Sequence, residues 1–271
     1  MSSNLAETVA QELFNAYQTG QMVAQPPSAR AGFDLETAYA VEGSLMRSRH
    51  AEGHRSAGRK VGYANKAMWR VLKLETLVWA HMYTDTLQFS EGSETAIRIK
   101  NPRSLKIEPE IVFGLKQPVT GGDAASALAS VDWMALGFEI IDCPYPEWKF
   151  QPADFVASFG LHAALVVGQK VPVTSDRLPS LVEELAKFKV RMFKAGAMVE
   201  EGSGKNSLKS PALCLAELGS AVARRFPDEP LGAGEVISTG TLTAGHLTTA
   251  SDRWTCEVEG LALPALTLTL A

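Results

Sequence analysis

Residues 105–113 read LKIEPEIVF, and apolar and polar side chains alternate along this stretch. A period of two over such a length predicts a β-strand that buries one face. Glu108 and Glu110 share one parity, so both carboxylates project from the same face, about 7 Å apart over two strand rises. Pro109 between them has no N–H to donate, and we therefore expect a sheet edge or a bulge at this position.

A third glutamate lies in a second predicted strand, residues 135–142, which read ALGFEIID. Apolar side chains at alternate positions pack one way, and Glu139 faces the other way. An ionised glutamate in such a strand costs several kcal/mol unless it is paired or binds a cation. Three carboxylates without histidine or thiol suit Mg²⁺ or Mn²⁺, with water or substrate completing the coordination. The alternative also stands that Glu108 and Glu110 lie on a solvated face and that Glu139 pairs with a lysine.

The same period of two continues through most of the chain after residue 94. Alternation predicts strands at 96–100 and 188–193, a continuous apolar run predicts one at 163–168, and further strands are expected at 234–242, 252–260 and 263–271. A hairpin turn is expected at Ala195-Gly196. One helix is predicted to interrupt the strands, with Ser210 as its N-cap and Pro211 in its first turn.

Helical patterns occupy the first part of the chain instead. An apolar stripe at steps of four runs through residues 4–17. Asp34 is placed as the N-cap of a second helix at 35–50, and a third, short helix is expected after Asn65. The pattern therefore predicts an α+β protein, with a small helical N-terminal portion at 1–90 and a mostly antiparallel β body at 91–271 that carries the metal site.

The composition excludes several classes of function. The 271 residues include 26 Lys and Arg against 30 Asp and Glu, and this mild acidity without a basic tract argues against nucleic-acid binding. No apolar run approaches the roughly 18 residues of a membrane span, and the N-terminus lacks the basic region of a signal peptide. Neither the dinucleotide-binding nor the P-loop glycine motif is present.

Cysteine usage favours a reducing, cytoplasmic location. Cys143, Cys214 and Cys256 are odd in number, widely spaced and without a C-x-x-C pair, so neither a disulfide framework nor a structural zinc site is expected. Cys214 lies in the apolar run PALCLAEL and is interpreted as a core residue.

Four dispersed blocks resemble the fumarylacetoacetate hydrolase superfamily. They are GRKVGYANK (58–66), KIEPEIVFGL (106–115), ALGFEIID followed by WKF (135–150) and GEVISTGTLT (234–243). Their order and gaps fit from about residue 58 to the last residue. Within the superfamily the chain is most similar to the 2-hydroxypenta-2,4-dienoate (2-oxopent-4-enoate) hydratases and the 4-oxalocrotonate decarboxylases of aromatic meta-cleavage pathways. The resemblance implies a mixed β-sandwich or roll body.

The resemblance also implies roles for individual residues. It makes Glu108, Glu110 and Glu139 the ligands of a divalent metal, Mg²⁺ or Mn²⁺. It makes Lys60 and Asp85 catalytic groups that handle protons, and it places Thr241 beside the substrate. From the residues alone, Lys60 could equally be a surface lysine and Asp85 the cap of a turn.

Two segments depart from the family pattern. Residues 158–161 read Ser-Phe-Gly-Leu where this branch usually has Asp-Asn-x-Ser, and residues 79–82 read Trp-Ala-His-Met in place of Phe-Gly-x-Leu. We therefore expect a more apolar substrate pocket, lined by Trp79, Phe159 and Leu161. His162, which follows the first changed segment, is interpreted as a core histidine rather than a catalytic group.

The resemblance implies a metal-dependent hydratase that adds water to a 2-hydroxydienoate or 2-oxo-enoate through an enolate. A 2-oxo-3-enedioate decarboxylase is the main alternative. An acylpyruvate C–C hydrolase ranks lower, because the His/Glu pair of that branch has no counterpart that we can place, and a catalytically inactive partner subunit is a further alternative. A homo-oligomer is expected, as is pairing with an enzyme of the same pathway.

Overall fold

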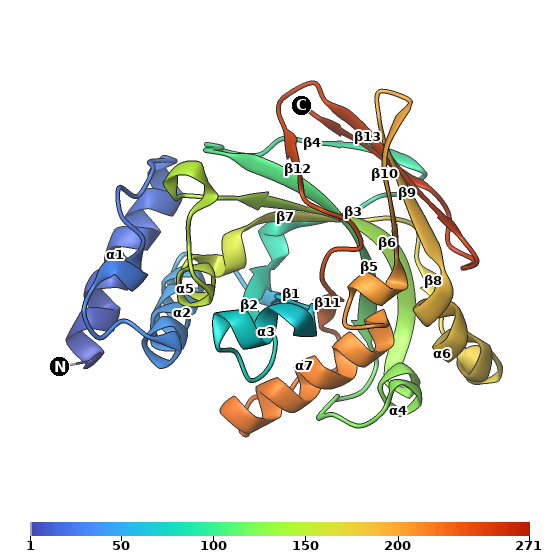
Figure 1. The fold of residues 1–271 in the computed structure, drawn as a ribbon, viewed down its shortest axis with the longest axis horizontal. Helices are drawn as coiled ribbons and strands as arrows, with labels where there is room; N and C mark the ends of the chain where they lie inside the picture. The colour runs from blue at the N-terminus through green and yellow to red at the C-terminus, as the bar shows by residue number, and fades with distance from the viewer. Residues whose placement is uncertain (1) are drawn as a thin grey trace.

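The computed structural model describes residues 2–271 and is drawn in Figure 1. The helices are α1 (Ser2–Thr19), α2 (Leu35–Ala51), α3 (Lys66–Leu72), α4 (Ala124–Ala129), α5 (Pro152–Ala157), α6 (Leu178–Lys187) and α7 (Pro211–Arg225). The first seven strands are β1 (Ser56–Gly62), β2 (Val78–Tyr83), β3 (Leu87–Phe89), β4 (Glu94–Ile97), β5 (Leu105–Leu115), β6 (Val131–Asp142) and β7 (His162–Val167). The others are β8 (Val171–Pro172), β9 (Lys189–Lys194), β10 (Ala197–Ser203), β11 (Val236–Ser238), β12 (His246–Thr248), β13 (Arg253–Glu259) and β14 (Leu266–Leu270).

Polar caps start the helices where the sequence pattern predicts them. Asp34 accepts a hydrogen bond from the backbone N–H of Thr37 and begins α2. Asn65 caps α3 in the same way, and Ser210 caps α7 with Pro211 in its first turn. The N-cap predictions for Asp34 and Ser210 and the predicted helix start after Asn65 are confirmed, because each cap satisfies an N–H that the first helical turn leaves unpaired.

The larger sheet, sheet A, has its main strands in the order β2-β1-β11-β5-β6-β7-β3. Strand β12 also pairs with β5, and β8 pairs with β6. The two outermost strands, β2 and β3, are joined only by the short turn Thr84–Thr86. Sheet A must therefore curl until its two ends approach each other, and this encloses one of its faces.

The smaller sheet, sheet B, has the order β10-β9-β13-β14-β4. Its β9–β10 hairpin turns at Ala195 and Gly196, which have φ of 49° and 83° and so confirm the predicted turn. In Figure 1, sheet B lies at one end of the molecule, α1, α2 and α5 lie at the other, and sheet A runs between them. No helix among residues 2–271 has the length and apolar character needed to cross a membrane.

Two expectations from the sequence differ from the structure. Besides α7, the helices α4, α5 and α6 also interrupt the later strands, so the prediction of a single helix there is wrong. These helices have 6, 6 and 10 residues, too few turns for a helical period to stand out. The portion before residue 90, expected to be helical, also contributes strands β1 and β2 to sheet A. These strands are almost wholly buried, so their sequences do not alternate between apolar and polar residues.

The helix-facing side of sheet A and the enclosed side differ in character. On the helix-facing side, Phe113, Leu136 and Phe138 belong to the main apolar core. A separate apolar cluster that includes Met82, Val112 and Leu165 fills one part of the enclosed side. By register, the rest of the enclosed side carries the three glutamates singled out above.

Candidate metal centre

The three glutamates face one another across β5 and β6. Glu108 and Glu139 are directly opposite in the antiparallel ladder, and Glu110 lies two residues further along β5. One carboxylate oxygen from each lies within 4.8 Å of the other two. Glu110 and Glu139 are buried and Glu108 is half-buried, so the cluster does not lie on a solvated sheet face.

Pro109 explains how the backbone around this cluster stays satisfied. Strand β11 pairs with residues 112–114 of β5 and β12 pairs with residues 105–107, so Pro109 faces the gap between these two short strands. Its carbonyl accepts a hydrogen bond from Leu242 N at 2.9 Å. Because N and C=O of one strand residue point to the same neighbour, the missing N–H also faces that gap. The sheet edge predicted at Pro109 is therefore limited to the gap between β11 and β12.

The segment that bridges this gap, residues 239–245, approaches the glutamates closely. Gly240 N donates to Glu110 Oε2 at 2.8 Å, and the hydroxyl of Ser238 donates to the same oxygen. Gly240 has φ of 90°, and a Cβ at Gly245 would lie 2.8 Å from Glu108 Oε1. Glycine at 240 therefore suits the backbone conformation, and a side chain at 245 would displace the Glu108 carboxylate.

Lys60 completes the cluster from β1. Its side chain is buried, with Nζ 2.9 Å from Glu139 Oε2, and Nζ donates to the carbonyl of Gly160 at 3.0 Å. This excludes the interpretation of Lys60 as a surface lysine. The structure combines the two alternatives for Glu139, since this carboxylate is paired with a lysine and also lies beside two other carboxylates.

The charges in this cluster do not balance. When all four groups are ionised, three carboxylates face one ammonium, which leaves an excess of two negative charges. Burial raises the pKa of Glu108 to about 7, although Lys60 opposes this shift. Burial and the charge of Glu139 raise the pKa of Glu110 well above its ordinary value. Burial also lowers the pKa of Lys60, but Glu139 and the other two carboxylates outweigh it, and the net shift is upward.

These features fit a divalent cation. Glu110 Oε1 is buried and has no hydrogen-bond partner among residues 2–271, which leaves a carboxylate oxygen with a free ligand position. A cation of charge two would cancel the excess negative charge. Oxygen donors without histidine or thiol in the ligand set suit a hard cation such as Mg²⁺ or Mn²⁺.

The altered segment at 158–161 holds Lys60 through its backbone. Phe159, Gly160 and Leu161 have φ of 55°, 61° and 57°, all in the left-handed region. Non-glycine residues pay roughly 1–2 kcal/mol each for this conformation. The turn aims the Gly160 carbonyl at Lys60, and a Cβ at Gly160 would come within 2.8 Å of Lys60 Cδ.

His162 is a neighbour of the centre that the sequence pattern did not assign to it. Its Nδ1 lies 3.0 Å from Glu139 Oε1 and its Nε2 lies 2.9 Å from Thr86 Oγ1. The imidazole is buried, as expected for a core histidine, but its partner is a candidate metal ligand. Ser238 is a second neighbour that the sequence reasoning missed, although it lies within the quoted block GEVISTGTLT.

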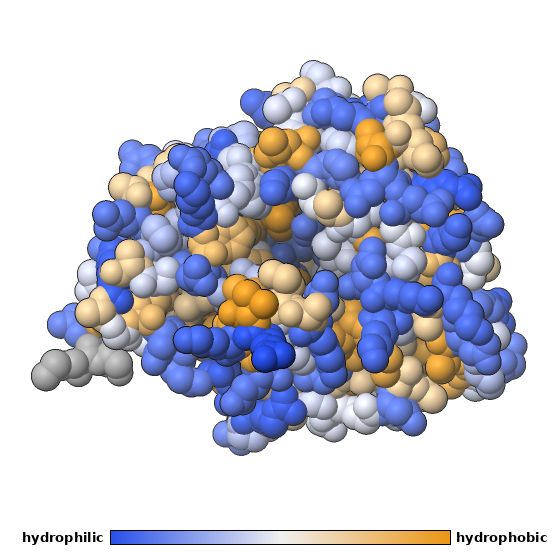
Figure 2. Space-filling view, viewed as in Figure 1, coloured by the Kyte–Doolittle hydropathy of each residue, from blue (hydrophilic) through white to orange (hydrophobic). Residues whose placement is uncertain are grey.

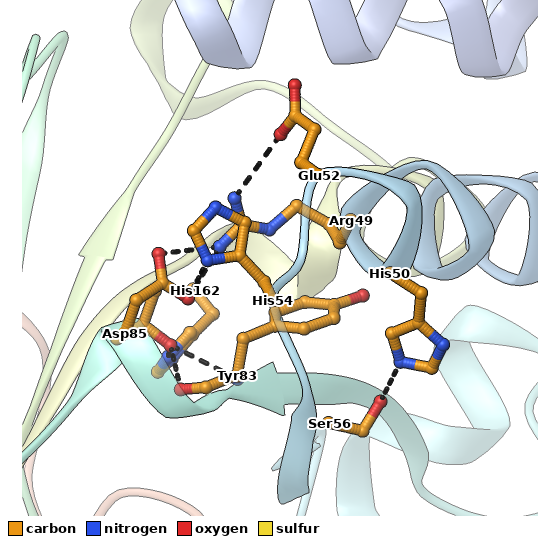
Figure 3. A network of polar contacts seen from close by, with 9 residues as sticks. Arg49, His50, Glu52, His54, Ser56, Tyr83, Asp85 and His162 are labelled. Carbon is orange, nitrogen blue, oxygen red and sulfur yellow. Dashed lines mark hydrogen bonds and ion pairs between the residues drawn. The ribbon is translucent and has the colours of Figure 1, made fainter.

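Asp85 lies in a different environment from Lys60. Figure 3 shows Arg49 of α2 reaching Asp85, with His54 beside them. Arg49 Nη2 lies 2.7 Å from Asp85, and His54 Nδ1 lies 3.3 Å from it. These residues line a cavity of 690 Å³, to which Thr86 and His162 also contribute. Asp85 is thus paired with Arg49, whereas Lys60 is paired with Glu139.

The three residues expected to line an apolar pocket are placed differently. Trp79 is buried on the helix-facing side of sheet A, against Tyr39 and Phe226, whereas Lys60 is on the enclosed side. The substrate-lining prediction for Trp79 is therefore wrong, because the alternation of β2 turns its side chain away. Phe159 packs on Tyr17, with ring centroids 4.7 Å apart. Leu161 is buried in the main core, and its role and that of Phe159 stay predictions.

Thr241 belongs to the 239–245 segment that covers Glu110. Its hydroxyl donates to the carbonyl of Thr243 at 2.8 Å, which stabilises the turn of this segment. Its place beside the substrate stays a prediction. Figure 2 shows that the face of the molecule in this view is hollowed near its centre.

Comparison with known proteins gives matches over almost the whole chain. The chain is 27% identical over 267 residues to a 2-hydroxyhexa-2,4-dienoate hydratase from Comamonas testosteroni, covering 97% of each protein. It is 29% identical over 227 residues to a 4-oxalocrotonate decarboxylase from Pseudomonas sp. (strain CF600), covering 83% of this chain and 81% of the relative. No family model matches the chain.

A solved structure matches the complete fold. The 4-oxalocrotonate decarboxylase from Pseudomonas putida G7, complexed with magnesium and adipate, superposes with a TM-score of 0.87 at 23% identity, covering 100% of this chain and 98% of the other. The fold is therefore shared with this decarboxylase and, less closely, with a fumarylpyruvate hydrolase from Pseudomonas aeruginosa, which superposes with a TM-score of 0.55 at 15% identity, covering 79% of this chain and 90% of the other. In sequence, the chain resembles 2-hydroxydienoate hydratases and 4-oxalocrotonate decarboxylases, as its sequence blocks predicted.

Proposed function

We propose that this chain is a lyase, a divalent-metal-dependent hydratase that adds water to a 2-hydroxydienoate or 2-oxo-enoate through an enolate. The observation that carries the proposal is the buried cluster of Glu108, Glu110 and Glu139 beside Lys60, with its excess of negative charge and one unpaired carboxylate oxygen. The similarity to hydratases over 97% of the chain supports the same activity.

The metal would be held by Glu108, Glu110 and Glu139. When bound there, Mg²⁺ or Mn²⁺ would supply Lewis-acid chemistry, that is, stabilisation of negative charge that develops on a bound 2-oxo acid. Ser238 and Gly240 N hold Glu110 Oε2, so they fix the orientation of this ligand. The apolar side chains around the cluster limit access of bulk water, which strengthens each electrostatic interaction.

Lys60 is the residue best placed to handle protons. Its Nζ is held on two sides by Glu139 and Gly160, so its position is fixed before substrate binds. In this proposal Lys60 transfers a proton to or from the reacting carbon chain during ketonisation and addition of water. Asp85 takes a secondary role, because Arg49 already neutralises its charge. Thr241, Phe159 and Leu161 remain candidates for substrate contact.

A 2-oxo-3-enedioate decarboxylase is the second candidate. The superposition of the entire chain on a 4-oxalocrotonate decarboxylase at a TM-score of 0.87 favours it. Both reactions use the same enolate, and they differ in whether water is added or CO₂ departs into the electron sink. For the protein as a whole, we further propose a roll of the superfamily type and a homo-oligomer that pairs with an enzyme of the same pathway.

One experiment separates these activities. Protein loaded with Mg²⁺ or Mn²⁺ is incubated with a panel of 2-hydroxydienoates and 2-oxo-3-enedioates, and the products are identified by mass spectrometry. Hydrated 2-oxo acids from the monoacids support the hydratase. If CO₂ is released from an enedioate faster than any monoacid is hydrated, the decarboxylase becomes the first candidate. If the protein turns over neither class of substrate, both candidates are contradicted.

A further inference from the structure

We infer that His162 is a positioning residue, which holds the Glu139 carboxylate in the orientation needed to bind the metal. This inference rests on the proposed metal site, and it adds a residue that the strand pattern and the family motifs leave out. The contacts that carry it are the 3.0 Å approach of Nδ1 to Glu139 Oε1 and the 2.9 Å approach of Nε2 to Thr86 Oγ1.

A β-bulge brings His162 to the enclosed side of sheet A. Glu139 is opposite Leu165 and Ile140 is opposite Ala164, but Ile141 is opposite His162, so one extra residue, Ala163, stands in β7. With regular pairing, residue 162 would face the helices, because it has the opposite parity to Leu165. The extra residue re-aims the imidazole toward Glu139, a use of bulges that recurs next to active sites.

Glu139 is held at both oxygens. His162 lies at Oε1 and Lys60 Nζ lies 2.9 Å from Oε2, so rotation of the carboxylate about its last bond would break one contact or the other. A carboxylate oxygen can only accept, so Nδ1 is the donor in this pair. Each carboxylate oxygen still has a second lone pair with which to bind a cation.

Thr86 fixes the other side of the imidazole. The Thr86 hydroxyl can donate to Nε2 or accept from it, so it is a partner for this nitrogen with or without a hydrogen on it. Thr86 Oγ1 is in turn held by the backbone of Tyr83: it accepts from Tyr83 N, and its single hydrogen can be donated to Tyr83 O or to Nε2. The chain from Glu139 through His162 to Thr86 is therefore anchored on the end of β2. Partners of this kind behind metal ligands change metal affinity about 10–100-fold when they are removed.

The test measures Mn²⁺ affinity by isothermal titration calorimetry on the full chain, without a turnover assay. Leu and Asn side chains have the same number of heavy atoms and the same branching at Cγ, but only Asn can donate a hydrogen bond near the position of Nδ1. We expect about 10–100-fold weaker Mn²⁺ binding for His162→Leu and near-wild-type binding for His162→Asn. His50→Leu is the matched control, because His50 is an exposed histidine paired with Ser56 Oγ at 2.9 Å, and it should leave Mn²⁺ affinity unchanged (Figure 3).

Equal Mn²⁺ affinity of the Leu and Asn variants would overturn the inference while leaving the proposed function intact. Absence of Mn²⁺ binding by the wild-type protein would overturn the metal site and the proposed function with it. If His162→Leu does not fold, the comparison can be made at Thr86, which holds the other side of the imidazole, with the variants Thr86→Val and Thr86→Ser. Thr86→Val should then weaken Mn²⁺ binding relative to Thr86→Ser, and equal binding by these two would overturn the inference.

Discussion

Strand β1 carries a buried cation on each of its faces, and the two differ in how their charges are balanced. Arg59 faces the helices, where it pairs with Glu235 and stacks on Trp79. The neighbouring pair on that side, Glu42 and His81, is also complete, with a 2.7 Å contact. Lys60, the next residue along β1, faces the three glutamates.

The pKa directions record this difference. Burial raises the pKa of Glu42, but the charge and hydrogen bonds of His81 outweigh it, so the net shift is downward. The pKa of Glu110 moves the other way, since burial and the charge of Glu139 together exceed the effect of Lys60. A balanced cluster of buried charge indicates a structural role, whereas an unbalanced one is a place where a cation can bind.

The largest expected effect follows from removing the ammonium group of Lys60, which is on the glutamate side of β1. Lys60→Ala should lower kcat by roughly 10²–10⁴, the range for loss of a positioned proton donor or acceptor. Circular dichroism should show an intact fold. The control is Lys66→Ala, an exposed lysine in α3, which should leave kcat unchanged. An unchanged kcat/KM for Lys60→Ala would mean that Lys60 only balances charge, like Arg59.

The next largest effect concerns the metal ligands. Glu139→Gln keeps the shape of the side chain but removes one of the charges that select a divalent cation. We expect it to weaken Mn²⁺ binding by more than the roughly 10–100-fold typical of residues behind a ligand. Calorimetry measures this directly. Glu42→Gln, on the balanced face, should leave Mn²⁺ affinity unchanged, and an equal loss in both variants would contradict the distinction drawn between the two faces.

A smaller effect, on stability alone, is expected from the balanced face. Arg59→Met leaves Glu235 without its partner, and removal of one member of a buried pair costs about 3–5 kcal/mol. Glu235 is 20% exposed, so the cost should be near the lower end, about 3 kcal/mol. Urea denaturation measures the loss, and calorimetry should find Mn²⁺ affinity unchanged. Weakened Mn²⁺ binding in this variant would mean that the two faces of β1 are coupled.

The sequence was sufficient to predict the glutamate side of this comparison. Glu108, Glu110 and Glu139 lie in strands whose alternate positions are apolar, so parity alone put Glu108 and Glu110 on one face of β5 and Glu139 opposite the apolar face of β6. The N-caps Asp34, Asn65 and Ser210 were also predictable, because side-chain capping is a local interaction. The buried character of Cys214 followed from its apolar neighbours.

The rest depended on features that parity cannot reveal. The bulge at Ala163 reverses the face of His162, so a regular strand would have placed it in the core. Trp79 was assigned to the pocket because residues 79–82 depart from the family pattern, but β2 is buried on both faces and its alternation turns Trp79 toward Tyr39 of α2. The left-handed run at Phe159–Leu161 has only one glycine, so local propensity gave no warning of it.

The smallest expected effect is a difference in the pH dependence of stability between the two faces. Burial raises the pKa of Glu108 from 4.5 to about 7, so the folded state holds this proton more tightly than the unfolded state does. The resulting stabilisation is fully present below about pH 4.5 and is lost as the pH rises through about 7. The pKa of Glu42 is lowered in the folded state, so this residue acts in the opposite sense and stabilises the fold at pH values above its ordinary pKa.

Metal-free protein should therefore lose about 1–3 kcal/mol of stability between pH 5 and pH 7.5, measured by urea denaturation. Added Mg²⁺ should restore this stability, mainly at the higher pH. Glu108→Gln should flatten this profile, whereas a metal-free protein that gains stability over the same interval would show that the glutamate cluster is balanced without a cation.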